Sequence, residues 1–377
     1  INTAIMSIGA LWGKAWPFLV AILYFGFLIL SHELGHFGTA KAFRVRVNEF
    51  SLGMGPRLLK FGKKETIYSL KAIPFGGSVL MEGENEDTED PRGFIKQKAW
   101  KRLCILVAGA LVNLICGLLI MTIFAGSAKL LGTTRIHSFT EGATSQAGGL
   151  QPGDAFRKIN GKRVVSSLDV DFLLSRDSDG IVDLVVRRGG EDIALPGVVF
   201  PVQTLENGQT ITGYDFHPLG IDRADVPKLQ YAGMVVQEGA RESVSVVRLV
   251  WLSLLDMVSG KFHFADISGP VGVVQIITDQ AQEAQQSSNN KADLLAALQN
   301  LLFLFALISI NIGVMNLLPI PALDGGRIFF CLVEMIFRKP IPKKLEAAVH
   351  GVGMLLLFAF MIVISFSDII AWVQGKR

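Results

Sequence analysis

Cysteine and charge are both scarce in this sequence of 377 residues. The three cysteines, Cys104, Cys116 and Cys331, lie inside or beside apolar runs, so they form neither a disulfide framework nor a four-thiolate zinc site. Charged residues make up 18% of the chain, against about 25% in average soluble domains, and 50% of the residues are apolar. This composition excludes intrinsic disorder and argues against a fully soluble chain. A net charge of +3 gives no support for nucleic-acid binding.

Four runs without a charged residue reach, or nearly reach, the length of about 20 apolar residues that a membrane-spanning helix needs. These runs cover residues 15–32, 103–128, 294–323 and 347–367. We therefore predict four transmembrane helices. A fifth stretch, 242–260, has apolar residues at helical spacing but is interrupted by Arg248 and Asp256. It predicts an amphipathic helix that lies either on the membrane surface or on a soluble domain.

The distribution of basic residues indicates the orientation of the chain. Residues 39–102 hold 13 Lys and Arg against 8 Asp and Glu, and residues 327–345 hold 5 against 1. Residues 130–293 hold 14 against 20. By the positive-inside rule, the first two segments face the cytoplasm and the third lies on the outer side. The sequence thus predicts a multi-pass protein of the inner (plasma) membrane.

Two segments outside the apolar runs have strand character. Between residues 44 and 82, short apolar runs alternate with glycine and proline, which predicts a β-hairpin or small meander between two membrane helices. Residues 133–200 predict an α+β module with strands at 155–159 and 181–187 and a helix at 167–175. Asn160-Gly161 is a strong signal for a type I′ hairpin turn within it. Residues 201–240 are polar, and we predict an irregular bridge back to the membrane.

The motif His32-Glu33-Leu34-Gly35-His36 carries the clearest chemistry in the chain. On a helix, His32 and His36 lie one turn apart on the same face, where both imidazoles can bind one Zn²⁺. Glu33 lies one residue further round and can act as a general base toward water. Buried histidines with only structural hydrogen bonds are the alternative, but ionisable groups at membrane depth are costly and mark functional sites.

A catalytic zinc ion needs a third protein ligand. The position that would give the metzincin arrangement is occupied by Ala42, and three of the other histidines lie in the outer segment. Asp324 is the better candidate because it ends the third apolar run on the same cytoplasmic side as His36. Pro319 breaks the helix before it, which frees backbone to shape a site. Capping of the following helix is the alternative role for Asp324.

The order of these elements resembles the site-2 protease family. His-Glu-Leu-Gly-His on the first membrane helix and Asn-Leu-Leu-Pro-Ile-Pro-Ala-Leu-Asp-Gly-Gly at 316–326 carry the resemblance. Residues 53–55 and 74–77 resemble the family's membrane-associated β-hairpin, and residues 108–113 resemble its second core helix, with Ala110 in place of the usual proline. The phrase Gly-Leu-Gln-Pro-Gly-Asp at 149–154 resembles a PDZ domain, and one such insertion is typical of the branch that performs regulated intramembrane proteolysis.

This resemblance implies a zinc endopeptidase that cleaves transmembrane segments of single-pass substrates after a first cut on the outer side. Anti-sigma factors and remnant signal peptides are the implied substrates, and the lipid bilayer and a peptide or protein ligand of the PDZ-like domain are the other implied partners. His32, His36 and Asp324 are the implied Zn²⁺ ligands, and Glu33 is the implied catalytic base. The residues implied to contact substrate are Asn316, Pro319, Gly53, Met54, Gly55, Phe75, Gly76 and Gly77.

A membrane metal transporter and a non-proteolytic PDZ scaffold that binds zinc are the two rival functions. A transporter needs polar residues along several helices, yet the second run offers little beyond Asn113 and Thr122. A scaffold has no use for a base at Glu33. The fold class predicted from all of these features is a polytopic α-helical membrane protein with a membrane-associated β-hairpin and one inserted α+β PDZ-like domain.

The predicted division of the chain follows from the same features. It comprises the first transmembrane helix (1–43), a cytoplasmic-side loop with the hairpin (44–101), the second transmembrane helix (102–131), the PDZ-like domain and bridge (132–230), the amphipathic helix and a linker (231–293), the third transmembrane segment (294–323), a cytoplasmic loop (324–345) and the fourth transmembrane helix (346–373).

Overall fold

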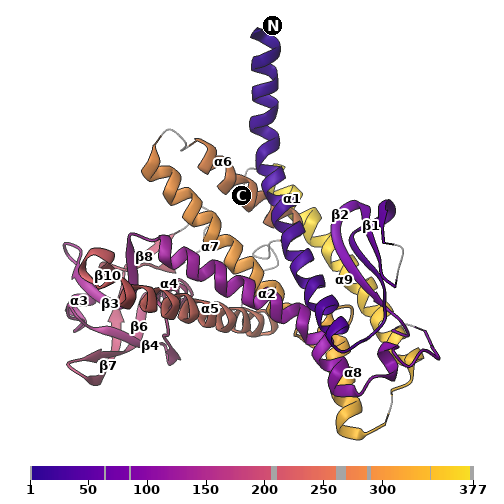
Figure 1. The fold of residues 1–377 in the computed structure, drawn as a ribbon. Coiled ribbons are helices and arrows are strands. Elements are labelled where there is room, and N and C mark those ends of the chain that lie inside the picture. Colours follow the sequence, from indigo (N-terminus) through magenta and orange to yellow (C-terminus); the bar gives the residue numbers. More distant parts are fainter. Residues whose placement is uncertain are drawn as a thin grey trace. The chain divides into compact units, whose positions relative to one another are not determined.

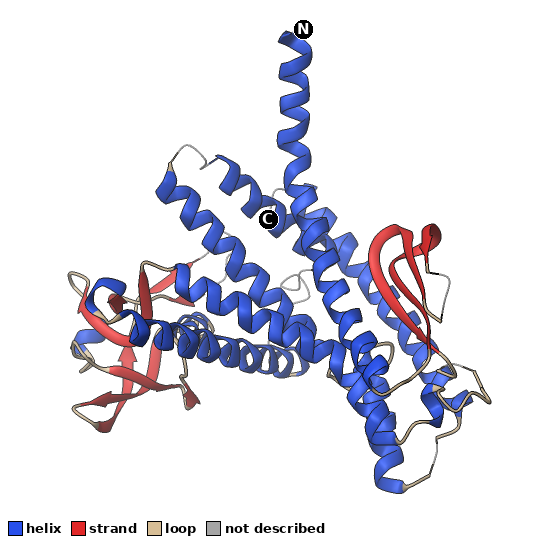
Figure 2. Ribbon diagram, viewed as in Figure 1, coloured by secondary structure: helices blue, strands red, loops and turns tan. Residues whose placement is uncertain are grey.

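The computed structural model of the chain describes residues 2–62, 65–84, 86–204, 210–259, 269–286, 290–339 and 341–373. The chain divides into two compact units, of which one combines Ile1–Gly117 with Phe262–Gly375 and the other is Leu118–Lys261. Figure 1 labels the elements of both units, and Figure 2 shows that the first is mainly helical whereas the second contains a sheet. Helix α2 contributes to both, because the division falls within it.

The first unit contains the long apolar helices and a β-hairpin. Its elements are α1 (Asn2–Ala42), β1 (Val47–Phe61), β2 (Ile67–Met81), η1 (Phe94–Lys96), the first part of α2 (Ala99–Ser127), α6 (Pro270–Gln286), α7 (Lys291–Met315), α8 (Asp324–Phe337) and α9 (Lys343–Val373). Among the described residues, four helices are long and apolar enough to cross a membrane, namely 15–42 of α1, α2, α7 and 344–370 of α9. The structure thus has four candidate membrane helices where the sequence predicts transmembrane helices.

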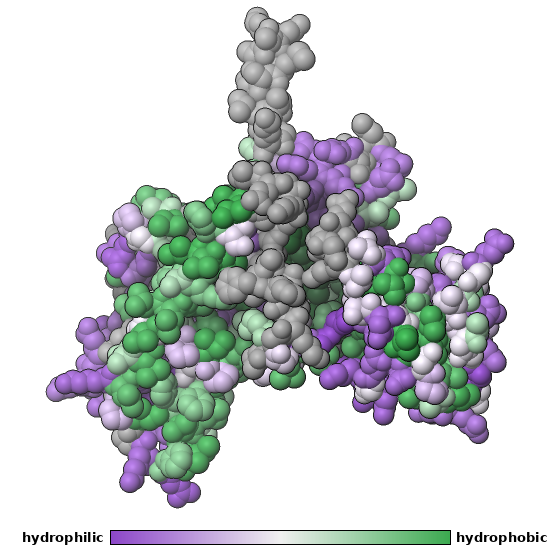
Figure 3. All heavy atoms as spheres, turned by 180° about the vertical axis from the view of Figure 1, so that it is seen from behind, coloured by the Kyte–Doolittle hydropathy of each residue, from purple (hydrophilic) through white to green (hydrophobic). Residues whose placement is uncertain are grey.

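The membrane-spanning helices expose apolar side chains that a soluble protein would bury. Along α9, Leu355, Leu356, Ile362 and Phe366 are each at least 65% exposed. Figure 3 shows such hydrophobic side chains gathered over the helical unit, whereas hydrophilic side chains cover much of the sheet unit. Large exposed apolar surfaces of this kind are stable only against lipid or another apolar partner.

Helix α6 lies where the sequence predicted a linker, and this is a correction. Val273, Val274 and Ile277 pack against Ala21, Tyr24 and Leu28 of α1. The N-terminal end of α6 is held by α9, because the Asp368 carboxylate accepts hydrogen bonds from the backbone N–H of Gly269 (3.0 Å) and Gly272 (2.8 Å). Residues 275–286 are rich in glutamine, so the apolar face of this helix was not evident in the sequence. Packing against α1 stabilises the helix.

The predicted hairpin forms from β1 and β2, and both long strands bend so that each of them contributes two paired segments. Residues 47–52 pair with 77–81 on one side, and residues 49–52 pair with 67–70 on the other. Residues 57–61 pair with 68–71. Segment 77–81 is therefore an edge of this small sheet, within the part of the chain that the structure describes. The hairpin contacts the C-terminal part of α1 through both strands, as Figure 1 shows.

The second unit is built around a six-stranded antiparallel sheet. Its elements after α2 are β3 (Leu130–Phe139), α3 (Thr144–Ala147), β4 (Ala155–Ile159), β5 (Lys162–Arg163), α4 (Ser167–Ser175), β6 (Ile181–Arg188), β7 (Glu191–Val199), β8 (Val202–Thr204), β9 (Thr210–Thr212), β10 (Phe216–Asp222), η2 (Arg223–Asp225) and α5 (Lys228–Val258). The strand order is β10-β3-β4-β6-β7, with β5 on β4. Apolar side chains from these strands and from α4 form one buried core.

Most local features of this unit agree with the sequence prediction. Helix α4 spans 167–175 as predicted, and Asn160 (φ 45°) and Gly161 (φ 73°) both adopt the positive φ that a type I′ turn requires. The predicted irregular bridge at 201–240 is wrong, because strand β10 pairs with β3 and completes the sheet. Residues 130 and 131 belong to β3 and not to the second helix, since a short apolar run alone does not distinguish a helix end from a strand start.

The amphipathic helix of this unit, α5, begins at Lys228 and covers the sheet domain. Asp169, buried in the capping box of α4, also accepts hydrogen bonds from Ser245 Oγ (2.9 Å) and from Arg248 Nη1 (3.1 Å). The apolar pattern predicted this helix only from residue 242. It did not reveal the start at Lys228, because small residues contact α2 in the first part of the helix. A Cβ on Gly239 would lie 2.5 Å from Thr122 Oγ1 of α2, so only glycine lets the two helices approach this closely.

We expect Glu242→Gln to stabilise the protein at alkaline pH. Burial, and secondarily the charge of Glu238, raises the pKa of the Glu242 carboxyl from 4.5 to about 7. The unfolded chain ionises this group at the lower value, so rising pH favours the unfolded state between the two pKa values. The variant should gain on the order of 2 kcal/mol at pH 8 and nothing at pH 4.

Thermal unfolding of the purified protein at both pH values measures this difference. Glu191→Gln is the matched control, because Glu191 is exposed on the same unit. Identical unfolding temperatures for wild type and Glu242→Gln at pH 8 would show that the Glu242 carboxylate is solvated after all.

Candidate metal centre

The candidate site lies where α1 and α2 cross at two glycines. A Cβ on Gly35 would lie 2.5 Å from the carbonyl oxygen of Ala108, and a Cβ on Gly109 would lie 2.3 Å from His36 Nε2. Both distances are far below van der Waals contact, so only glycine permits this approach. Helix α2 continues through Ala110, which is fully buried, so alanine in place of the family's proline leaves the helix regular.

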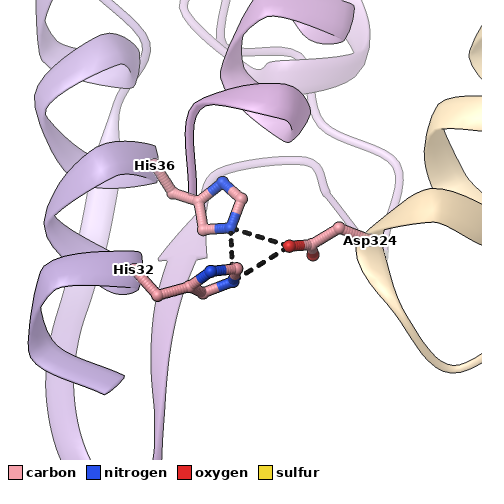
Figure 4. A group of neighbouring side chains, drawn as sticks. All are labelled: His32, His36 and Asp324. Atoms are coloured by element: carbon pink, nitrogen blue, oxygen red, sulfur yellow. Dashed lines mark hydrogen bonds and ion pairs between the residues drawn. The ribbon is translucent and has the colours of Figure 1, made fainter. Parts of the chain in front are cut away.

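Three side chains from two distant parts of the chain converge beside this crossing, as Figure 4 shows. His32 Nε2 and His36 Nε2 lie 3.1 Å apart, and Asp324 Oδ2 lies 3.0 Å from His32 Nε2 and 3.1 Å from His36 Nε2. Three atoms bound about 2.0–2.1 Å from one tetrahedral zinc ion are roughly 3.3 Å apart. The observed triangle therefore fits a zinc ion, with a fourth position left for water or substrate.

The surroundings of the imidazoles also fit metal binding. His36 Nδ1 donates a hydrogen bond to the carbonyl oxygen of Ile105 (2.8 Å), which leaves Nε2 unprotonated and turned toward Asp324. His32 Nδ1 is buried and finds no hydrogen-bond partner among the described residues. Asp324 Oδ2 lies within 3.1 Å of both Nε2 atoms, so one carboxylate oxygen completes the set of ligand atoms.

Backbone constraints place Asp324 at this position. Helix α7 ends at Met315, and the chain then folds back so that Gly325 lies against Leu318. A Cβ on Gly325 would lie only 1.8 Å from the carbonyl oxygen of Leu318. Asp324 is the first residue of α8, whose N-cap is Leu323. The Asp324 side chain contacts the histidines, so the alternative role as a helix cap is wrong.

The structure places Glu33 against the hairpin. A Cβ on Gly77 would lie 2.7 Å from Glu33 Cγ, so this glycine is where the edge segment 77–81 meets the active-site helix. Two of the predicted substrate-contacting glycines, Gly53 and Gly76, have positive φ of 86° and 84° and shape the bend of the hairpin. Met54 packs on Gly76.

The remaining predicted substrate residues are less directly placed. Gly55 also has a positive φ of 86° and lies against Ile73, while Asn316 forms the C-cap of α7 and Pro319 lies in the turn before α8. The side chain of Phe75 lies outside the described part of the structure. None of these roles is tested by the geometry, and they stay predictions.

Asn113 is a structural residue that the site requires. It is fully buried, its Oδ1 accepts a hydrogen bond from Ser31 Oγ (3.1 Å), and its backbone oxygen accepts one from Ser309 Oγ (2.8 Å). It thereby links α1, α2 and α7 next to His32. The available signal was a lone asparagine inside an apolar run, which is costly in lipid unless it is paired.

Comparisons with known proteins agree with this geometry. The family model described as peptidase family M50 matches residues 20–360. A protein of Clostridium acetobutylicum that carries the name of a zinc metalloprotease is 34% identical over 93% of this chain and 97% of its own length. One of Fusobacterium nucleatum with the same type of name is 32% identical over 93% and 98%. The regulator of sigma-W protease RasP of Bacillus subtilis is 25% identical over 92% and 97%.

Two histidines and an adjacent carboxylate on a helix long enough to cross a membrane, with a third metal ligand from α8, are the arrangement of a multi-pass membrane metalloprotease. The chain belongs to peptidase family M50, the site-2 protease family, as its resemblance to that family indicated. Zn²⁺ is its cofactor, and the two rival functions, transporter and inert scaffold, are set aside.

We expect Gly109→Ala to weaken zinc binding. The added methyl carbon would lie only 2.3 Å from His36 Nε2, so the imidazole would have to move. Gly38→Ala is the matched control. Gly38 lies on the same helix as both histidines, and a Cβ there would meet nothing within 4 Å. Competition with a chromophoric chelator measures the zinc affinity of the purified variants, which should fall 10- to 100-fold for Gly109→Ala alone. Equal affinity in both variants would show that the crossing relaxes without disturbing the triad.

Proposed function

We propose that this protein is an intramembrane endopeptidase that hydrolyses peptide bonds within transmembrane segments of single-pass proteins. The observation that carries the proposal is the position of the triad. His32 and His36 belong to a helix long and apolar enough to cross the membrane, and Asp324 follows another. A protease with two metal ligands on one such helix, and the third shortly after another, acts on peptide bonds at membrane depth.

The chemistry follows from the residues of the site. His32, His36 and Asp324 would hold the zinc ion, since their Nε2 atoms and a carboxylate oxygen lie close together. When bound, zinc polarises the scissile carbonyl and makes water more acidic. The Glu33 carboxylate takes a proton from the attacking water and delivers it to the nitrogen of the leaving amine. The water oxygen first forms the new C–O bond, the C–N bond then breaks, and Glu33 is again ionised at the end.

The hairpin answers a physical problem that a helical substrate poses. A transmembrane helix hides its peptide bonds in internal hydrogen bonds, and unwinding it in lipid costs several kcal/mol per unsatisfied polar group. The edge segment 77–81 offers backbone donors and acceptors beside Glu33. An unwound substrate that adds to this edge as a strand regains its hydrogen bonds and presents an extended backbone to the zinc.

The sheet unit fits a role in substrate selection on the outer side of the inner membrane. Its strand and helix order supports the PDZ-like assignment, and its sequence carries the acidic excess that the positive-inside rule places outside. We infer that it admits trimmed substrates, such as anti-sigma factors or signal-peptide remnants after a first cut. RasP, the relative named as a regulator of sigma-W, supports this class of substrate.

We expect Glu33→Gln to retain zinc and lose proteolysis. The amide keeps the shape of the side chain but cannot accept a proton, so cleavage should fall by about 10²–10⁴-fold. Cleavage of a model transmembrane peptide in detergent, together with metal analysis, measures both properties. Asp324→Asn is the control, since it should lose zinc and activity together. Near-normal cleavage by Glu33→Gln would remove Glu33 from the mechanism.

Thiol labelling in intact cells tests the proposed topology. In a background without Cys104, Cys116 and Cys331, a cysteine replacing the exposed Ser178 of the sheet unit should react with a membrane-impermeant maleimide. One replacing the exposed Glu89 of the loop after β2 should react only after the cells are opened. The reverse pattern would invert the proposed orientation.

A further inference from the structure

The turn that delivers Asp324 to the metal centre contains a strained residue. Ala322 has a φ of 79°, in the left-handed region that costs a non-glycine residue roughly 1–2 kcal/mol. Such conformations persist only where the surroundings fix them. Because Ala322 is two residues before Asp324, any relaxation of its backbone moves the carboxylate away from His32 and His36.

Helix α9 supplies the contacts that hold this turn. His350 Nδ1 accepts a hydrogen bond from the Ala322 backbone N–H at 3.1 Å. A Cβ on Gly353 would lie 2.2 Å from Pro321 Cβ, so the backbone of α9 lies directly against the turn. On the other side, His350 Cε1 lies 3.0 Å from a Cβ built on Gly326, in the first turn of α8. The imidazole is therefore wedged between the turn and the helix that Asp324 begins.

The other ring nitrogen of His350 has a different environment. An imidazole that accepts at Nδ1 carries its proton on Nε2 when neutral. His350 Nε2 is buried, finds no partner among the described residues, and belongs to a side chain that lines a cavity of about 450 Å³ together with Arg327 and Glu346. A cavity of this size, with charged side chains in its wall, has room for water that can accept a hydrogen bond from Nε2.

We propose that His350 is a positioning residue of the zinc site, which holds the strained Ala322 peptide and so aims Asp324 at the metal. The proposal rests on the proposed role of Asp324 as a zinc ligand. His350 itself does not touch the metal or the substrate in this scheme. It acts through one hydrogen bond to the backbone, as residues behind metal ligands commonly do.

The decisive measurement is zinc affinity, determined by competition with a chromophoric chelator on the purified full-length protein in detergent. His350→Leu removes the acceptor and should weaken zinc binding 10- to 100-fold. His350→Asn places its Oδ1 at nearly the position of Nδ1 and should restore affinity to within about threefold of wild type. Thermal unfolding of each variant identifies any that fails to fold.

A second substitution separates positioning from simple packing. Glycine adopts a φ of 79° without strain, so Ala322→Gly should recover most of the affinity lost in His350→Leu when the two are combined. A packing defect at His350 would not respond to a glycine on the turn. If His350→Leu is too unstable to purify alone, the zinc affinities of His350→Asn and of the double variant are compared with wild type. A value more than about tenfold below wild type in either would then overturn the positioning role.

Each outcome decides the question. Wild-type zinc affinity in a folded His350→Leu, failure of His350→Asn to bind better than His350→Leu, or failure of Ala322→Gly to rescue would overturn the positioning role. Asp324→Asn in the same titration is the reference for the proposed function. If Asp324→Asn binds zinc normally, the ligand assignment has failed. If it loses affinity while His350→Leu does not, only the positioning role has failed.

Discussion

The zinc site depends on the close approach of α1 and α2 at Gly35 and Gly109. Because neither residue has a side chain, the Ala108 carbonyl oxygen and the His36 imidazole occupy the space that two methyl groups would fill. Two imidazoles one helical turn apart can then bind one metal ion beside the backbone of α2. In lipid, where apolar burial contributes little to helix association, small residues and close packing are what hold such helices together.

Hydrogen bonds link the helices around this crossing. Asn113 links α1, α2 and α7 through Ser31 and Ser309, and His36 Nδ1 is fixed on the Ile105 carbonyl oxygen. An unpaired polar group in hydrocarbon is costly, so each of these bonds selects one arrangement of the helices. The same bonds set the direction of the metal ligands, which joins folding and catalysis in one network.

The third ligand and the hairpin reach the site by backbone conformation and not by helix packing. Glycines at 325 and 326 let the turn fold over the start of α8, and Gly77 lets the edge strand lie against Glu33. Both arrangements use positions where a Cβ would clash. Irregular backbone thus lies beside the metal centre, where neighbouring protein can satisfy its polar groups.

Elements with local signals could be predicted from the sequence. Four apolar runs gave the membrane helices, His32, Glu33 and His36 gave the metal chemistry, and Asn160-Gly161 gave a turn, since period, spacing and turn type are properties of neighbouring residues. The tertiary structure alone decided what depends on distant contacts. It brought Asp324 to His36 across 288 positions, added β10 to the sheet, and made α6 a helix against α1. It also revealed the contact of His350 with the turn before α8. A lone histidine in an apolar run gives no local sign that it accepts a hydrogen bond from the distant Ala322 N–H.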